Sequence, residues 1–268
     1  ALENHIYPYL YNVPLKKVSP LQIQMVLAPL ASASKSLNDK VIQVLRGTFR
    51  TAMDNNLIAR SPLPSNLRIG GVRTQEKSAL TAEQSQRLLD AIKGTRAYLF
   101  CLIALQTGLR RGEICGLMWS DIDLKARIIH VRHNAILSNG QTTVSEALKT
   151  SAAVRDLPIP PTLLAVLAQE YQNARSLFVL HMENGSPISK SSLKNLLRII
   201  ENRTANHPAE LGTAAPNSKV LRTLDFHVNP HQLRHTYITR LFESGLDIKE
   251  IQYLAGHSTV NMTLRVYT

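Results

Sequence analysis

The chain has 268 residues, of which 44% are hydrophobic and 19% are charged. This composition excludes a disordered protein, and the length allows one large domain or two. Lys and Arg number 31 against 19 acidic residues, a net charge of +12. The excess favours a polyanionic partner such as DNA or RNA, with a merely solvated basic surface as the alternative. The longest apolar run, residues 97–105, is too short to cross a bilayer.

The two cysteines, Cys101 and Cys115, lie in apolar segments with a helical pattern. Two cysteines exclude a disulfide scaffold, and their context predicts buried thiols in a reducing compartment. No signal peptide is visible in the sequence. These features favour a cytoplasmic protein.

Residues 1–68 are predicted to be mostly helical. Ser19 and Pro20 provide a cap and an N1 proline for one helix, and apolar side chains at helical spacing predict a second from about 37 to 55. Residues 1–78 carry ten basic and four acidic side chains, a net charge of +6, which leaves +6 for the rest. The second helix has a basic face that we expect to contact DNA, formed by Lys40, Arg46 and Arg50.

Residues 69–78 read as a linker, and residues 79–268 as a second, larger domain. Thr81 and Gln84 have capping-box spacing. A helix over 98–106 should end at Gly108. Strands are predicted over 127–137, 141–148 and 154–159, the first two joined by a hairpin turn at Asn139-Gly140. Further helices are expected over 161–174, 191–202, 230–244 and 248–254, with a long loop over 203–228. The predicted fold class is mainly α with a small antiparallel β-sheet (α+β).

The first candidate site residue is Arg110, which opens a short helix after Gly108. Glu113 lies three residues later, on the same helical face. An arginine at this point can offer a bidentate fork to a phosphate while the carboxylate holds its orientation. Taken alone, the spacing favours an ordinary surface ion pair.

Lys149 lies in a turn between two predicted strands. Most lysines at such positions are simply solvated. Farther along the chain, His231 and Arg234 share one face of a helix, so that an imidazole and a guanidinium can converge on one ligand. His231 and His235 have the spacing of a zinc pair, but Gln232 stands where the helical zinc motif has glutamate, and we expect no metal ion or other cofactor.

The last two candidates are His257, which follows a glycine at the end of a helix, and Tyr267, ten residues later. Each has an ordinary structural reading. Together with the earlier residues they form the set that phosphoryl transfer to a tyrosine requires. Two arginines can neutralise a pentavalent phosphate, a lysine can protonate the leaving 5′ oxygen, and a histidine can assist loss of the phenol proton, whose pKa is ordinarily about 10.

Residues 107–119 and 231–267 resemble the two signature motifs of the tyrosine recombinases, or phage-type integrases, and are most similar to integrases of phages and conjugative transposons of Gram-positive bacteria. The resemblance implies catalytic roles for Arg110, Lys149, His231, Arg234 and His257, a bracing role for Glu113, and Tyr267 as the nucleophile. It also implies that residues 1–68 are a helical core-binding domain that binds DNA. The family continues past its tyrosine into a helix that packs on a neighbouring protomer, whereas only Thr268 follows here.

The resemblance implies a site-specific recombinase of a bacterial mobile element. Such an enzyme cleaves and rejoins double-stranded DNA through a 3′-phosphotyrosyl intermediate, as a homo-oligomer that is a tetramer in the full-length protein. Two alternatives remain at this point. A type IB topoisomerase uses the same catalytic set to relax DNA. A non-enzymatic DNA-binding regulator would account for the helix–turn–helix pattern near residue 244, but not for Arg110, Lys149 and Tyr267.

Overall fold

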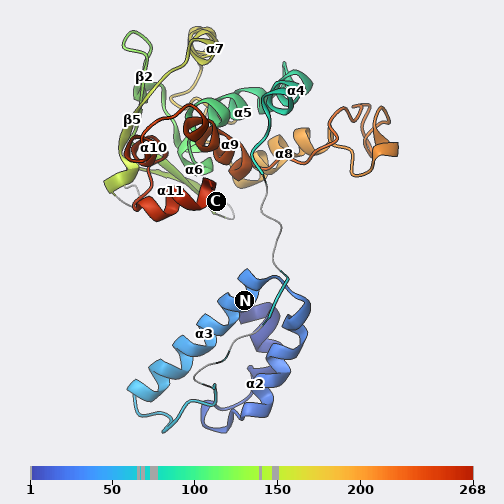
Figure 1. Ribbon diagram of the computed structural model, residues 1–268, viewed down its shortest axis with the longest axis vertical. Helices are drawn as coiled ribbons and strands as arrows, with labels where there is room; N and C mark the ends of the chain where they lie inside the picture. Colours follow the sequence, from blue (N-terminus) through green and yellow to red (C-terminus); the bar gives the residue numbers. More distant parts are fainter. Residues whose placement is uncertain are drawn as a thin grey trace. The chain divides into compact units, whose positions relative to one another are not determined.

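The structure is a computed structural model that describes residues 2–64, 67, 70–72, 78–138, 141–146 and 151–267. The chain divides into two compact units, 1–76 and 77–268, here called the N-terminal and C-terminal units (Figure 1). The boundary falls inside the predicted linker, residues 69–78. No helix in the described ranges is long and apolar enough to span a membrane.

The N-terminal unit is helical and is organised by α2 (Pro20–Leu27) and α3 (Lys35–Asp54). Ser19 caps α2 through a capping box with Gln22, which confirms the predicted start, and Ser34 caps α3. The short elements are a π-helical turn (Leu2–Ile6), α1 (Tyr7–Leu10) and two 3₁₀ turns (Leu15–Lys17 and Ala28–Ser32).

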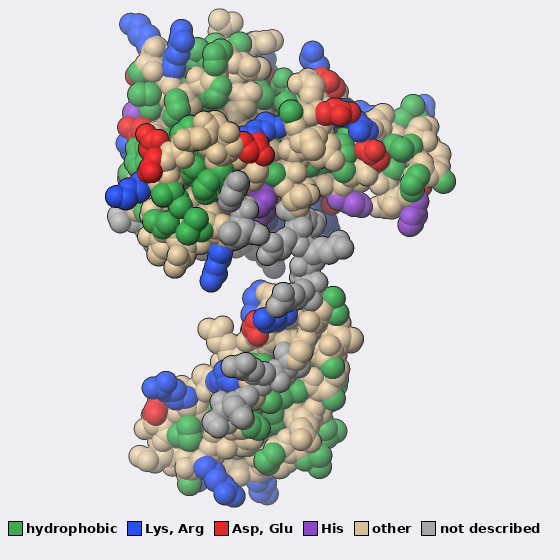
Figure 2. All heavy atoms as spheres, in the orientation of Figure 1, with side chains coloured by type: hydrophobic (Ala, Val, Ile, Leu, Met, Phe, Trp, Pro, Cys, Tyr) green, Lys and Arg blue, Asp and Glu red, His purple; other side chains and the backbone are tan. Residues whose placement is uncertain are grey.

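The two sides of α3 differ in character. Its buried side chains, among them Val41, Leu45 and Phe49, recur at helical spacing and form a core with α2. Lys40, Arg46 and Arg50 are exposed on the other side. Figure 2 shows Lys and Arg side chains at several places along the edges of this unit.

The C-terminal unit is built around α5 (Arg96–Thr107), whose side chains are buried almost all round and pack against α9 (Pro230–Glu243). Thr81 forms the predicted capping box with Gln84 at the start of α4. Both cysteines are buried in this core, as predicted. The remaining helices are α4 (Ala82–Ile92), α6 (Arg111–Gly116), α7 (Pro161–Gln172), α8 (Lys190–Glu201), α10 (Ile248–Ala255), α11 (Val260–Tyr267) and the 3₁₀ turns Trp119–Asp121, Ser151–Ala153 and Pro208–Glu210.

In the described residues the strands form two antiparallel sheets, where the sequence predicted one. β1 (Ile122–Asp123), β2 (Ile128–Val131) and β5 (Arg155–Pro158) make a three-stranded sheet in the order β1-β2-β5, and β3 (Asn134–Leu137) pairs with β4 (Thr142–Ser145). The predicted strand 127–137 is therefore wrong as a single element: it contains both β2 and β3. The fold class, mainly helical with small antiparallel sheets, is confirmed.

The break between β2 and β3 has a physical cause at His133. Its ring Nδ1 lies 2.9 Å from both carboxylate oxygens of Asp121, so the chain is tied to the turn after α6. β3 then packs on α6, where glycines allow a close approach: a Cβ on Gly116 would lie 2.8 Å from the backbone nitrogen of Ala135. The hairpin turn predicted at 139–140 lies outside the described residues, but β3 and β4 pair on either side of it.

Residues 203–228 form a long connection, as predicted, and Figure 1 shows it projecting beyond α8. It is held by two isolated bridges, Thr204 to Leu224 and Ala214 to Leu221. Arg222 lies 3.6 Å from the carboxylate of Glu210. This connection therefore has internal contacts of its own, which its sequence pattern did not reveal.

Candidate active site

A turn between α5 and α6 positions Arg110. Gly108 ends α5 in the left-handed conformation, with φ of +62°, and a Cβ there would lie only 2.2 Å from the Cδ1 atom of Tyr237. Only glycine satisfies both the backbone conformation and this close contact. Arg110 is then the residue at the N-cap of α6.

Glu113 holds Arg110 from two directions. Its Oε1 accepts from Arg110 Nη1 at 2.7 Å, and its Oε2 accepts from the Arg110 backbone N–H at 2.8 Å. The Glu113 side chain is buried, while that of Arg110 is 36% exposed. Burial would raise the pKa of Glu113, but the charges and hydrogen bonds of Arg155 and Arg110 outweigh burial and lower this pKa to about 2. The carboxylate is thus ionised throughout the physiological range.

Arg155, on β5, is a buried partner of Glu113 that the sequence reading missed. Its side chain has no exposed surface, and its Nη2 donates to Glu113 Oε2 at 2.9 Å. Leu157 in β5 and Ile159 directly after the strand are buried, in alternation with Arg155. In the predicted strand 154–159, an arginine at the same side as two apolar residues is a signal that could have identified it.

The helix α9 supplies His231 and Arg234, one turn apart. Arg234 is buried, and burial, followed by the charge of Arg110, lowers its pKa to about 9, so it remains a cation at neutral pH. Its Nη1 donates to the carbonyl of Gly108. His231 is exposed, and its pKa is lowered by partial removal from water and by the charges of Arg234 and Arg110.

The C-terminal end of α10 connects three arginines. Gly256 ends this helix in the left-handed conformation, with φ of +62°. Consecutive carbonyl groups at residues 254, 255 and 256, called here the 254–256 turn, each accept from a different guanidinium. Since carbonyls at a helix C-terminus lack helical partners and carry partial negative charge, guanidinium donors are favourable there. Arg155 donates to the carbonyl of Leu254, Arg234 to that of Ala255 and Arg110 to that of Gly256.

His257 directly follows this turn and is buried. Its Nδ1 lies 3.0 Å from the hydroxyl oxygen of Thr263, a buried residue of α11 that the sequence reading did not single out. Burial, followed by the charges of neighbouring arginines, lowers the pKa of His257 to about 4. The imidazole is therefore neutral at pH 7.

Two candidates are described only in part or not at all. Tyr267 is the last residue of α11, a helix absent from the sequence-based expectations, and it follows Thr263 by one helical turn. Lys149 lies outside the described residues. The strands on either side of it, β4 and β5, belong to different sheets. The catalytic role of Lys149 stays a prediction.

Four of the residues predicted to be catalytic line one cleft of about 850 Å³, together with Glu113, the predicted bracing residue. α6, β3, the start of α9 and the turn after α10 form its walls, and Asn134, Asn229 and Ser258 add polar side chains. The cleft therefore gathers cations and imidazoles from segments far apart in the sequence, a combination suited to binding a phosphodiester. The four residues are Arg110, His231, Arg234 and His257.

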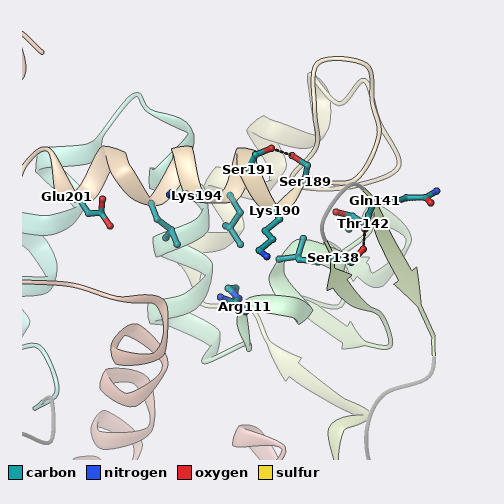
Figure 3. A pocket seen from close by; sticks show the side chains of 12 residues that line it. Arg111, Ser138, Gln141, Thr142, Ser189, Lys190, Ser191, Lys194 and Glu201 are labelled. Carbon is teal, nitrogen blue, oxygen red and sulfur yellow. Dashed lines mark hydrogen bonds between the residues drawn. The ribbon is translucent and has the colours of Figure 1, made fainter. Parts of the chain in front are cut away.

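A second hollow of about 660 Å³ adjoins this cleft, since Arg111 and Leu137 line both. Lys190 and Lys194 reach it from α8, as Figure 3 shows, and Glu201 lies at its far end. Hydroxyl groups of the β3–β4 hairpin and of the start of α8 complete the lining. Basic side chains thus extend beyond the cleft along this face of the unit.

The three residues predicted to bind DNA lie on α3, in the N-terminal unit. Arg46 Nη2 donates to the carbonyl of Leu67 at 2.8 Å, and Arg50 lies 3.9 Å from the carboxylate of Asp54. Both members of the second pair are largely exposed, so this pair leaves Arg50 accessible. Lys40 is exposed as well.

Comparison with known proteins finds similar sequences among tyrosine recombinases and transposon transposases. A tyrosine recombinase XerC-like protein of Caldanaerobacter subterraneus subsp. tengcongensis is 27% identical over 97% of this chain and 69% of its own length. The transposase of transposon Tn916 from Enterococcus faecalis is 25% identical over 83% of this chain and 56% of its own length. The chain thus spans between about half and two thirds of these relatives.

Solved structures agree with these relatives. The Tn1549 transposon integrase, in complex with a circular intermediate DNA, superposes with a TM-score of 0.74 at 25% identity, over 95% of this chain and 82% of that one. A lambda integrase tetramer bound to a Holliday junction, 20% identical, has the same fold, with a TM-score of 0.65 over 95% of this chain and 68% of that one. The sequence profile of the phage integrase family matches residues 78–268. This chain therefore belongs to the phage integrase family of tyrosine recombinases.

Proposed function

We propose that the chain is the DNA-cutting and DNA-joining part of a site-specific recombinase of a mobile element, acting in the bacterial cytoplasm. The observation that carries this proposal is the convergence of Arg110, His231, Arg234 and His257 on one cleft. The Tn1549 and Tn916 relatives, which are transposon proteins, support the mobile-element role. Supercoil relaxation tested beside recombination of paired sites separates this role from that of a topoisomerase.

In the proposed reaction the phenol oxygen of Tyr267 attacks a DNA phosphorus, and the bond from phosphorus to the 5′ oxygen breaks. The products are a 3′-phosphotyrosyl linkage and a 5′ hydroxyl. Arg110 and Arg234 bind the non-bridging oxygens, on which negative charge accumulates in the transition state. Lys149 supplies the proton for the leaving oxygen, and a histidine, His257 in its neutral form, assists loss of the phenol proton. Rejoining is the same reaction in reverse.

Both units take part in binding duplex DNA in this proposal. The N-terminal unit serves as the core-binding domain through the exposed basic face of α3. In the C-terminal unit, Arg111, Lys190 and Lys194 extend the positive surface beyond the cleft and contact backbone phosphates beside the cleaved one. Exchange between two duplexes requires four cuts, so the full-length protein works as a homo-oligomer, a tetramer at the stage of exchange.

DNA binding should weaken steeply with salt. Each phosphate contact releases counterions, so the logarithm of the affinity should fall linearly with the logarithm of salt concentration, by about 0.9 per contact. Replacing Lys40, Arg46 and Arg50 together by Ala should make this slope shallower. The measurement is a fluorescence anisotropy titration on a mixed-sequence duplex; an affinity unchanged between about 50 and 200 mM salt contradicts the proposal.

Cleavage should continue in excess EDTA. Phosphoryl-transfer enzymes often use Mg²⁺ to neutralise charge on the phosphate. Here Arg110, Arg234 and Lys149 are proposed to supply that positive charge. The test compares covalent adduct formation with EDTA and with added Mg²⁺, and equal rates are expected. A strict Mg²⁺ requirement indicates a different mechanism.

The cleavage rate should lack the acid limb of an ordinary histidine. An unperturbed imidazole has a pKa of about 6.5 and would be half protonated there. Because burial and neighbouring charges lower the pKa of His257 to about 4, its ring stays largely neutral as the pH falls from 8 to 5, and the pKa of His231 is shifted in the same direction. Single-turnover rates measured over this range test the point. A fall with a midpoint near 6.5 contradicts it.

A further inference from the structure

Among the described residues, the buried cation Arg155 has no part in the proposed catalytic roles. The Arg155 side chain has no exposed surface, so it cannot touch DNA. A buried guanidinium is costly unless its donors are paired. Arg155 alternates with buried Leu157 and Ile159, so its position is one that an apolar residue would usually occupy. Something other than burial must therefore account for a charge at this point.

Every nitrogen of the Arg155 guanidinium is paired with a part of the candidate site. Nη2 and Nη1 donate to the two carboxylate oxygens of Glu113, at 2.9 and 3.3 Å. Nε donates to the carbonyl of Leu254, in the 254–256 turn, at 2.9 Å. Nη1 also donates to the carbonyl of Ala153 at 2.8 Å, four residues after Lys149 in the sequence. One side chain thus connects three segments that carry candidate catalytic residues.

The geometry points to Arg155 as a positioning residue for the proposed strand cleavage: it fixes Glu113 against Arg110 and fixes the turn that precedes His257. This inference rests on the proposed function. Glu113 lies between two guanidiniums, since Arg155 binds its two oxygens and Arg110 binds them through its own side chain and backbone N–H. Without Arg155, Glu113 loses the partner that fixes its plane.

A close fit at Gly256 supports the second part of this role. A Cβ on Gly256 would lie 2.8 Å from Nη1 and 3.0 Å from Cζ of Arg155. Gly256 also has φ of +62°, and its carbonyl accepts from Arg110. The turn before His257 is therefore packed directly on the Arg155 guanidinium, so a change in that side chain is transmitted to the turn.

The charges around Glu113 predict a pH signature. Arg155, Arg110 and Arg234 are the cations that act on it, from β5, the start of α6 and α9. Burial raises the pKa of Glu113, and the charge of Arg155 is the largest effect that lowers it. Replacing Arg155 by Met removes that charge, so the pKa of Glu113 should rise. Protonated Glu113 is neutral and no longer forms an ion pair with the Arg110 guanidinium. The cleavage rate of Arg155→Met should then fall as the pH is lowered. This fall should begin at a higher pH than any fall in the rate of the wild type.

The experiment measures single-turnover covalent adduct formation at saturating DNA, from pH 5 to 9, beside DNA affinity and thermal unfolding. The probe is a duplex selected from a randomised pool by binding to the wild-type chain. Arg155→Met should lower the adduct rate about 10- to 100-fold, as loss of groups that orient a reactive side chain does elsewhere, with DNA affinity changed far less. Arg155→Lys, which restores the charge without the planar fork, should move the acid limb back toward the wild-type position.

The matched control places the same substitution in Glu113→Gln, which cannot titrate. If Arg155 acts on the pH profile through Glu113, the double variant should show no new acid limb, and the rate loss that remains in this background measures the contact of Arg155 with the 254–256 turn. This comparison leaves no uncompensated buried carboxylate, so it also serves if Arg155→Met alone fails to fold. A new acid limb in the double variant, or an unchanged rate and pH profile in Arg155→Met, overturns the inference. Absence of any adduct from the wild-type chain instead overturns the proposed function.

Discussion

Tyr267→Phe is expected to abolish the covalent protein–DNA adduct and to leave DNA affinity nearly unchanged. The substitution removes only the phenol oxygen, the atom proposed to attack phosphorus, and it keeps the ring. Nothing else in the proposed reaction can form the 3′-phosphotyrosyl bond, so the loss should be complete within detection. Denaturing gels after quenching with detergent measure the adduct, and anisotropy titration measures binding.

Tyr253→Phe is the matched control. Tyr253 lies on α10, is 52% exposed, and its hydroxyl accepts from the backbone N–H of Asp156 at 3.1 Å. That bond ties α10 to β5 at the surface, so its loss should cost little stability and no chemistry. If Tyr253→Phe stops adduct formation while Tyr267→Phe does not, the nucleophile has been assigned wrongly.

Arg110→Ala and Arg234→Ala are each expected to slow cleavage by about 100- to 1000-fold, the usual loss when one donor to a transition-state charge is removed. Arg234→Ala should also lower the thermal unfolding midpoint, because buried Arg234 donates to carbonyls of Gly108 and Ala255 that would lose their partner. Single-turnover adduct rates at saturating DNA, read beside unfolding curves, separate the two effects.

Arg110→Lys tests the geometry of the phosphate contact. An ammonium keeps the charge but cannot bind Glu113, the carbonyl of Gly256 and a phosphate in one plane, so this variant should also be slow. Arg132→Ala is the matched control: Arg132 is 41% exposed and pairs with Asp156 outside the cleft. A near-normal rate for Arg110→Lys would contradict the planar-fork argument.

Local signals in the sequence predicted much of the fold. Ser19 and Thr81 mark helix starts because a cap is formed by residues within one turn, and Gly108 marks a helix end for the same reason. The pairing of strands is not local. The split into two sheets depends on the contact between His133 and Asp121 and on glycines of α6 that face β3, which no pattern within 127–137 contains.

In the candidate site, too, contacts between residues close in sequence could be predicted, and contacts between distant residues could not. The spacing of His231 and Arg234 already placed that pair on one helix face. The spacing of Arg110 and Glu113 also predicted their contact, although Arg110 is the N-cap residue of α6 and lies before the helix. Arg155 reaches Glu113 across 42 residues, and its partner Leu254 lies 99 residues away, so only tertiary structure brings them together. The contact of Thr263 with His257 likewise depends on how α11 packs against the turn after α10.

The most direct test of the central claim is chemical identification of the protein–DNA bond. The wild-type chain is incubated with the selected duplex, with a nick scanned along each strand so that the short 5′-hydroxyl fragment diffuses away and rejoining is prevented. Mass spectrometry of the digested adduct then locates the nucleotide. The expected result is a 3′-phosphate joined to the phenol oxygen of Tyr267. No adduct, a 5′ linkage, or attachment to another residue would contradict it.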